Sequence, residues 1–196
     1  HPLNSSLYGL FSSTIVEQLS RMGHVVGQEN LYDQHFDPVL SAREGETYYQ
    51  ENHGVAHLAG PIDRPVSSDA IVLVFPTWWF GFPAILKGWF DRVWAPSVAY
   101  DHAGDTGPIR PRLHKLKKVF AVTTLGAPWW VDYLVLRRPV RRILRHALLS
   151  ACSRDCRLKF LSFYQCESID SARLNQHIEK ISAELNRFLR TRANET

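Results

Sequence analysis

The sequence predicts an α/β domain in which a parallel sheet is covered by helices on both faces, and three observations support this. Segments 69–75 and 118–124 are continuous apolar runs rich in β-branched residues, which is typical of central parallel strands. Between and around these runs, apolar residues recur at helical spacing, so strands and helices alternate along the chain. With 196 residues, 45% of them hydrophobic, the chain is long enough for one substantial core. We therefore predict a single doubly wound domain over residues 1–196.

The first part of the chain predicts a helix followed by a short strand. The helix covers about residues 5–22 and ends at Gly23, and its apolar face consists of Leu7, Phe11, Ile15, Leu19 and Met22. Segments 24–26 and 30–32 are interpreted as a short strand leading into a loop, and the polar segment 44–60 as a weak helix or loop. Because a doubly wound sheet normally begins with a strand, we expect a first strand to be missing before His1.

The remaining elements alternate regularly. The strand over 69–75 ends at Pro76, and apolar residues at helical spacing predict a helix over 83–93 with Pro83 in its first turn. A second buried strand covers 118–124 and a third covers 158–164, with a basic helix over 137–149 between them. A long final helix begins near Asp170, with Ser168 or Asp170 as its cap.

Ligands of open α/β sheets bind beyond the carboxyl ends of the strands, so three loops are candidate binding segments. Residues 1–6 offer hydroxyls and free N–H groups at a helix N-terminus, which suits a phosphate, although a serine there is more often only a cap. Residues 76–82 carry two tryptophans, where a planar heterocycle could stack, although tryptophan is also a common core residue. Residues 123–128 add two hydroxyls and Gly126. Together the loops predict a site for a flat, hydrogen-bonding ligand.

The run FPTWWFGFPAILKGWFDRV, residues 75–93, resembles the flavin-binding signature of the NAD(P)H:quinone oxidoreductase family, in which a Pro-x-x-Trp-Phe loop precedes a Pro-Ala-x-Leu-Lys-Gly-Trp helix. The match is long and ungapped. The similarity extends over most of the chain up to about Ala127, and beyond that point it is general and closest to the shorter bacterial relatives. Further matches in the same order are His1-Pro2, Leu31-Tyr32, the segment 36–41, Ala99-Tyr100 and Thr123-Thr124.

The resemblance implies a flavodoxin-like fold and a flavoenzyme that passes a hydride from NAD(P)H to a quinone or similar acceptor in a two-electron ping-pong reaction. The flavin would be FAD, with FMN as the alternative. By this resemblance His1 and Ser6 contact the phosphate side of the flavin, and Thr123, Thr124 and Gly126 lie near its pyrimidine end. The loop along the isoalloxazine would be Pro76, Thr77, Trp78, Trp79 and Phe80.

Departures from the family pattern leave the catalytic residues unassigned. Thr-Thr-Leu-Gly stands where the larger enzymes have Thr-Thr-Gly-Gly, Tyr8 replaces a usual Asn, and the family's catalytic Tyr/His pair has no counterpart. His102 and His114 could donate a proton, although a histidine without a catalytic role is the commoner case.

The resemblance also bears on partners. We expect a homodimer, because Trp89, Phe90, Trp94 and Tyr100 exceed what one small core readily covers, and Tyr100 matches a residue that reaches toward the partner's site in family dimers. An alternative function is an ancillary regulatory flavoprotein of a cation antiporter, since such proteins share the aromatic loop and the run found here at residues 99–104.

Charge and composition exclude several other functions. The net charge of +4 comes largely from five arginines between residues 137 and 145, which predict a solvated helix face or, alternatively, a site for a nucleotide phosphate or an acidic partner. No nucleic-acid-binding signature, metal-ligand spacing, membrane span or signal peptide is recognisable. Three cysteines without a CxxC pair favour a reduced, cytoplasmic protein.

Overall fold

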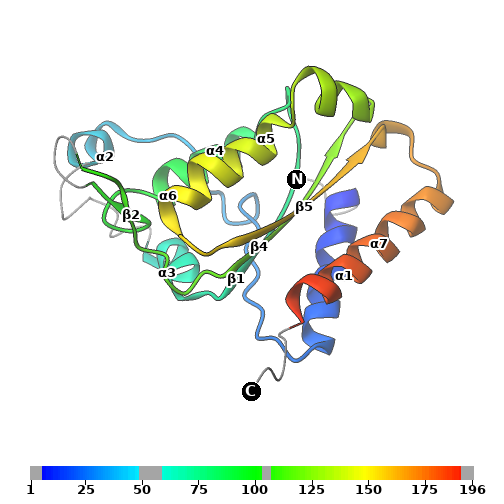
Figure 1. Cartoon of the computed structure of the whole chain (residues 1–196), viewed down its shortest axis with the longest axis horizontal. Helices are drawn as coiled ribbons and strands as arrows, with labels where there is room; N and C mark the ends of the chain where they lie inside the picture. The colour runs from blue at the N-terminus through cyan, green and yellow to red at the C-terminus, as the bar shows by residue number, and fades with distance from the viewer. Residues whose placement is uncertain (1–5, 49–58, 103–106, 191–196) are drawn as a thin grey trace.

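The computed structural model describes residues 6–48, 59–102 and 107–190, and its centre is a parallel sheet of three strands. The strands are β1 (Ala70–Pro76), β4 (Lys118–Leu125) and β5 (Arg157–Tyr164), in the order β1-β4-β5. Helices cover both faces of this sheet (Figure 1). The predicted flavodoxin-like α/β fold is therefore confirmed, and the strands predicted over 69–75, 118–124 and 158–164 all form.

The middle strand β4 shows why the fold has two cores. Its side chains alternate between the faces of the sheet, as in any strand. Val119 and Ala121 pack into the core on the side of α4, whereas Phe120 and Val122 pack into the core on the other side. Both faces of β4 are buried, which accounts for its uninterrupted apolar sequence.

Two long helices cover one face of the sheet. These are α1 (Leu7–Arg21) and α7 (Ser171–Leu189), which pack side by side. Their N-caps are Ser6 and Asp170, whose side chains accept hydrogen bonds from the backbone N–H groups of Gly9 and Arg173. Caps of this kind satisfy N–H groups that have no partner inside a helix.

The opposite face is covered by shorter elements. The helix α4 (Ala84–Val93) follows β1, and the connection from β4 to β5 contains η2 (Val131–Val135), α5 (Pro139–Arg142), η3 (Ile143–Leu149) and α6 (Ser150–Cys152). The remaining elements are α2 (Ala42–Thr47), α3 (Ala59–Ser67), the antiparallel pair β2 (Tyr100–Asp101) and β3 (Arg110–Pro111), and η4 (Cys166–Ser168).

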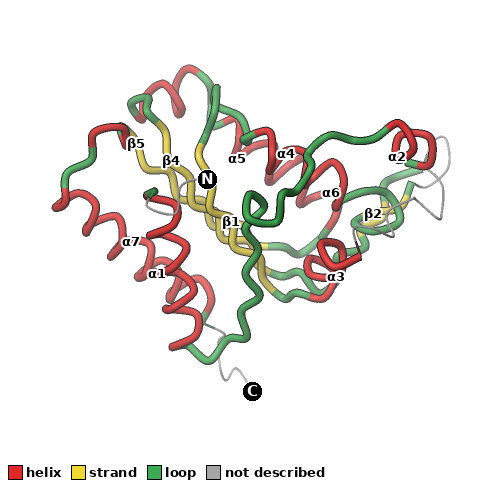
Figure 2. The backbone as a smooth tube through the Cα atoms, turned by 180° about the vertical axis from the view of Figure 1, so that it is seen from behind, coloured by secondary structure: helices red, strands yellow, loops and turns green. Residues whose placement is uncertain are grey.

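The prediction of a short strand within residues 24–32 is wrong. These residues form an extended loop and a turn, and Figure 2 shows this loop running from the end of α1 past β1 to α2. A strand needs a neighbour that accepts and donates its backbone hydrogen bonds. In the described part of the chain residues 24–32 pair with no strand, and the parallel sheet consists of β1, β4 and β5.

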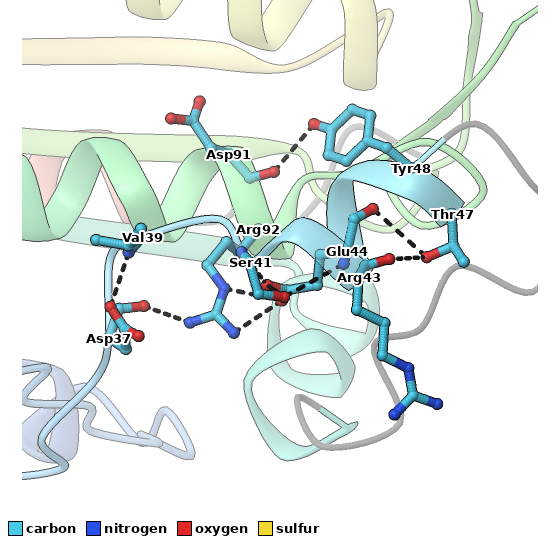
Figure 3. A network of polar contacts seen from close by, with 9 residues as sticks. All are labelled: Asp37, Val39, Ser41, Arg43, Glu44, Thr47, Tyr48, Asp91 and Arg92. Carbon is cyan, nitrogen blue, oxygen red and sulfur yellow. Dashed lines mark hydrogen bonds and ion pairs between the residues drawn. The ribbon is translucent and has the colours of Figure 1, made fainter.

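A buried ion pair fastens α2 to α4. The carboxylate of Glu44, 1% exposed, accepts hydrogen bonds from Nε and Nη2 of Arg92 at 2.9 and 2.7 Å. Its other oxygen accepts from the backbone N–H of Ser41 at 2.8 Å and from the Ser41 hydroxyl at 2.7 Å. Arg92 also donates to the carbonyl oxygen of Asp37, so the pair holds the loop before α2 as well (Figure 3).

Segment 36–41 and the helix α4 meet at Gly88. A Cβ atom at this position would lie 2.2 Å from the carbonyl oxygen of Pro38, so no larger residue fits without movement of the backbone. Both segments belong to the resemblance described above. Their contact gives several of its residues a structural role in packing this loop against the helix.

The aromatic residues of α4 are covered within one chain. Trp89, Phe90 and Trp94 are 5%, 2% and 4% exposed, and Trp94 packs edge-on against Phe90 with ring centroids 5.1 Å apart. The expectation that they exceed what one core covers is therefore wrong. They pack in one core with residues of β1, β4 and the helices that connect β4 to β5.

Candidate functional site

The aromatic loop after β1 forms a tight turn with unusual backbone geometry. The N–H of Gly81 donates to the carbonyl of Trp78 at 2.8 Å, and the N–H of Trp78 donates to the carbonyl of Gly81 at 3.2 Å. Between them, Trp79 and Phe80 have φ angles of +48° and +55°. Two positive φ angles characterise a type I′ turn, where Asn-Gly is usual. Each bulky residue in this conformation costs about 1–2 kcal/mol.

The two tryptophans of the strained turn are exposed. Trp79 is 98% exposed and Trp78 is 61% exposed, although large aromatic residues gain most when they are buried. Backbone strain and an exposed aromatic surface on one short turn are typical of a binding site. The turn stands at the carboxyl end of β1, where ligands of this sheet architecture bind.

Threonine hydroxyls line the adjacent ends of β1 and β4. The Oγ1 atoms of Thr77 and Thr123 are 2.6 Å apart and share a hydrogen bond, and the N–H of Thr77 donates to the carbonyl of Thr124 at 3.0 Å. Thr123 and Thr124 are 1% and 5% exposed. Their hydroxyls are thus partly used within the protein, and they fix the aromatic turn against β4.

Tyr8 reaches this cluster from the first turn of α1. Its hydroxyl shares a short hydrogen bond with Oγ1 of Thr124. Burial raises the pKa of the Tyr8 phenol and outweighs the lowering effect of the bond to Thr124, so the phenol stays protonated at neutral pH. Sequence reasoning recorded Tyr8 only as a departure from the family pattern, and the 116-residue separation from Thr124 left no local signal for the contact.

A second aromatic group follows β4. Trp129 and Trp130 are 56% and 48% exposed, and the ring of Trp129 lies edge-on to Tyr133 of η2. Beneath them the buried carboxylate of Asp132 accepts a hydrogen bond from the hydroxyl of Tyr164 at 2.7 Å. Burial is the main cause that raises the pKa of Tyr164, and the bond to Asp132 adds to it. The segment is held firmly although its outer surface is apolar.

A small cavity lies between the carboxyl ends of β1 and β4 and the connection that follows β4. It is lined by Thr77 and Thr123 on the sheet side and by Asp132 and Arg138 on the side of η2 and α5. The guanidinium of Arg138 lies 4.4 Å from the centre of the Tyr133 ring, a cation–π contact. The loops after β1 and β4 therefore lie against each other and form one site at the carboxyl edge of the sheet.

The structure brings together most of the residues expected at this site. Pro76, the last residue of β1, pairs with Thr124, and Thr77 hydrogen-bonds to Thr123 and Thr124. Trp78, Trp79 and Phe80 follow directly in the turn closed by Gly81. Gly126 follows the end of β4, and a Cβ atom there would lie 2.4 Å from a carboxylate oxygen of Glu167.

Other predicted residues are placed differently or not described. The Ser6 hydroxyl is used as the cap of α1, which is the simpler of its two interpretations. His1 lies outside the described residues, and so do residues 103 and 104 of the segment 99–104. His114 stands before the start of β4, at the opposite end of the strand from Thr124, and this position gives it no contact with the site.

The residues present fit a flavin. A planar ring system can rest against an exposed tryptophan turn, and the backbone of a turn that carries no bulky side chain at Gly81 can approach the polar rim of such a ring. Among the described residues, no group of histidine, cysteine and acidic side chains is arranged to hold a metal ion. None of the described helices is long and apolar enough to cross a membrane.

Comparison with known proteins places these features in a family. A family model described as flavodoxin-like fold matches residues 1–190. Residues of the chain are 30% identical over 145 positions to the NAD(P)H dehydrogenase [quinone] 1 of Cavia porcellus, a match that covers 65% of this chain and 51% of that protein. The chain thus spans about half the length of this relative.

Solved structures agree with the fold. An NAD(P)H:quinone oxidoreductase from Methanothermobacter marburgensis superposes with a TM-score of 0.82 at 21% identity, covering 94% of this chain and 93% of that one. An FMN-dependent NADH-azoreductase from Bacillus anthracis, in complex with FMN, superposes with a TM-score of 0.73 at 14% identity, covering 94% and 92%. At these identities the likeness establishes the fold alone.

Proposed function

The chain belongs to the flavodoxin-like fold family, with sequence similarity to NAD(P)H:quinone oxidoreductases, and we propose that it is a flavin-dependent enzyme that passes a hydride from NAD(P)H to a quinone or similar acceptor. The observation that carries the proposal is the strained turn at Trp79 and Phe80, which holds an exposed aromatic surface beside the threonines of β4. The similarity of the chain to a quinone dehydrogenase supports the same chemistry.

The site residues would divide the work as follows. Trp78, Trp79 and Phe80 would hold the isoalloxazine, and the segment from Thr123 to Gly126 would donate hydrogen bonds to its pyrimidine end. Ser6 and His1 would lie on the phosphate side. A bound flavin supplies the hydride transfer itself, so the protein needs mainly to position the ring and exclude water. Thr77 contributes indirectly, because its bond to Thr123 holds the turn in place.

Tyr8 and the Thr124 hydroxyl supply a protonated group beside this site. Because burial raises the pKa of the Tyr8 phenol, Tyr8 acts in this proposal as a hydrogen-bond donor that orients Thr124. The donor that protonates the reduced acceptor stays unassigned.

Several finer points form part of the proposal. The flavin is FAD, with FMN as the alternative, and the hydride is exchanged in a two-electron ping-pong reaction in which donor and acceptor use one site in turn. We also propose a homodimer in the cytoplasm. Because Trp89, Phe90 and Trp94 are buried within one chain, these side chains are not part of the dimer interface.

Flavin reconstitution tests the function directly. The protein is unfolded, refolded with FAD or FMN, and the flavin retained after gel filtration is identified by its mobility and quantified. Oxidation of NADH and NADPH is then followed with quinone, azo and nitroaromatic acceptors. We expect one flavin to be retained and quinone-dependent oxidation to appear. Retention of neither flavin, together with no oxidation by any acceptor, would contradict the proposal.

A pair of variants connects the activity to the site. Replacing Trp78 and Trp79 by Ala should weaken flavin binding by at least about tenfold, because a stacked aromatic contact contributes about 0.5–1.5 kcal/mol beyond its area. The matched control is Ile109→Ala, another exposed hydrophobic residue on a different surface, which should bind flavin normally. Equal affinity in both variants would place the flavin elsewhere.

A further inference from the structure

The segment after the second tryptophan pair exposes an unusual amount of apolar surface. Leu134 and Val135 are 68% and 60% exposed, and Ile143 is 45% exposed. With Trp129, Trp130, Tyr133 and Leu136 they form an apolar patch that we call the η2 patch. Contiguous exposed apolar surface of this kind usually marks a contact with a partner or a membrane.

The same segment is strongly basic. Exposed arginines occur at positions 137, 142 and 145, and Arg138 and Arg141 are half-buried between them. Within the described residues none of the five forms an ion pair with a carboxylate. Burial lowers the pKa of Arg141, and the neighbouring charges of Arg138 and Arg145 lower it further, which reflects mutual repulsion. The arginines next to the η2 patch therefore carry a positive charge that no neighbouring carboxylate compensates.

The position of the segment allows contact with a flat surface. In Figure 1 the lime-green coil that contains η2 lies beyond the arrowheads of β4 and β5, at the edge of the molecule. Asp132 is the only acidic residue between positions 129 and 152, and it is buried. The segment that lies beyond the strand ends and the helix that follows it thus combine exposed apolar side chains with exposed arginines and carry no exposed acidic residue.

A second copy of this chain matches the patch poorly. A twofold dimer places the same patch of two copies against each other, and here each copy would bring its arginines toward the other's with no exposed acidic residue of the segment between them. Opposed like charges cost several kilocalories per mole at an interface. The complementary partner is therefore negatively charged and accepts apolar side chains.

We propose that the η2 patch is a docking surface for an anionic lipid bilayer. Trp129, Leu134 and Val135 insert at the boundary between headgroups and acyl chains, where tryptophan is enriched in membrane proteins. The arginines extend to the lipid phosphates, because their long apolar stems can lie along the patch while the charged groups stay in water. Binding of this type is peripheral and reversible.

Docking would also orient the candidate site. The patch follows β4 directly, so the carboxyl edge of the sheet, with Thr77 and Thr123, would lie near the bilayer. The docking itself does not depend on the proposed flavin chemistry, and it can be tested on protein without any cofactor. If the proposed function also holds, this placement favours acceptors that partition into lipid.

Co-sedimentation with vesicles tests the proposal. The protein is mixed with vesicles of equal parts phosphatidylglycerol and phosphatidylcholine, or of phosphatidylcholine alone, at low and at high salt. We expect binding to the anionic vesicles that weakens as salt rises, since screening reduces the attraction of each arginine. Bromine-labelled lipids should quench tryptophan fluorescence on binding, and this quenching should fall in the Trp129→Phe/Trp130→Phe variant.

Two patch variants separate the apolar and the electrostatic contributions. Arg142→Glu/Arg145→Glu should weaken binding by more than about tenfold, because each basic residue near an anionic surface strengthens binding about fivefold. Leu134→Ser/Val135→Ser should weaken it by about tenfold through lost apolar burial. These side chains are exposed, so the variants should unfold at the temperature of the wild-type protein.

Matched controls change the same chemistry elsewhere. Val25→Ser/Val39→Ser alters two aliphatic residues that are 103% and 66% exposed, and Arg43→Glu/Lys115→Glu reverses two exposed charges. Both should bind vesicles like the wild type. The proposal is overturned if anionic vesicles bind no better than neutral ones or if the patch variants bind normally. Sedimentation that shows a wild-type dimer and monomeric patch variants would assign the patch to a second copy instead.

Discussion

The six tryptophans of the chain divide into two groups with opposite environments. Trp89 and Trp94 of the α4 region are 5% and 4% exposed, whereas the four in the loops after β1 and β4 range from 48% to 98% exposed. The buried pair stands on or beside a helix whose apolar residues recur at helical spacing. The exposed pairs follow the ends of strands: Trp78 and Trp79 lie in the turn after β1, and Trp129 and Trp130 lie in the helical turn that leads into η2. Position relative to the strand ends, and not residue type, separates the buried tryptophans from the exposed ones.

The largest expected difference between the two groups concerns stability. Trp89→Ala should lower the free energy of unfolding by about 3–5 kcal/mol, because it opens a cavity in a core shared with Phe90 and Trp94. Trp78→Ala should change it by less than about 0.5 kcal/mol. Urea unfolding followed by circular dichroism measures both. Similar losses in the two variants would mean that the exposed turn is also part of the folded core.

The buried ion pair between Glu44 and Arg92 should stabilise the α4 region more than an exposed ion pair on the same helix. Arg92→Ala should cost about 3 kcal/mol or more, because the carboxylate of Glu44 is then left buried without its partner. Lys87→Ala, on the same helix, removes an exposed pair with Asp91 and should cost less than about 1 kcal/mol. If Lys87→Ala proved as costly as Arg92→Ala, burial would not be what distinguishes the two pairs.

The same pair predicts a pH dependence. Burial alone would raise the pKa of Glu44, but hydrogen bonds from Ser41 and Arg92 and the charge of Arg92 outweigh it and lower the pKa to about 2. A carboxyl whose pKa is lower in the folded than in the unfolded protein stabilises the fold above its unfolded pKa, about 4.3. This contribution is lost as the pH falls from about 5 to 2. Glu44→Gln should therefore flatten the stability curve in that range.

Much of the fold could be predicted from local patterns. β1, β4 and β5 each contribute side chains to both cores; β1 and β4 are continuous apolar runs, whereas β5 has polar residues among its apolar ones. The helices α1, α4 and α7 show helical periodicity with recognisable ends. The prediction of a strand within residues 24–32 was wrong because strand formation depends on a neighbouring strand, which the local sequence does not reveal. The pair β2 and β3, only two residues each, was too short to show any periodicity.

The candidate site could be predicted only in outline. The aromatic loop and the threonines were identifiable because they follow apolar strands. Contacts between residues far apart in the sequence could not be predicted. Examples are Tyr8 with Thr124, and Glu44 with Arg92, which are 48 residues apart. One local signal was available but not used: Ser41 and Glu44 have the spacing of a capping box, and the structure contains one.

A glycine pair tests the packing of α4 against segment 36–41. Gly88→Ala should destabilise the protein by about 1–3 kcal/mol, because its Cβ atom would lie 2.2 Å from the carbonyl oxygen of Pro38. Gly45→Ala, in α2, meets nothing within 4 Å and should stabilise the protein by about 0.4–1 kcal/mol. Thermal unfolding of the two variants measures the difference. A Gly88→Ala variant as stable as the wild type or more stable would show that segment 36–41 can move away from α4.

The smallest expected effect is a change in stability on replacing Trp79, one of the exposed tryptophans. Trp79→Asn should raise the free energy of unfolding by about 1 kcal/mol, because asparagine tolerates the positive φ that Trp79 adopts, while flavin binding weakens. Trp130→Asn is the matched control, since Trp130 is also exposed but has an ordinary φ of −67°, and its stability should not rise. A gain in both variants would reflect the loss of an exposed indole alone. A gain at Trp79 only, together with weaker flavin binding, would support the proposal that the turn sacrifices stability for ligand binding.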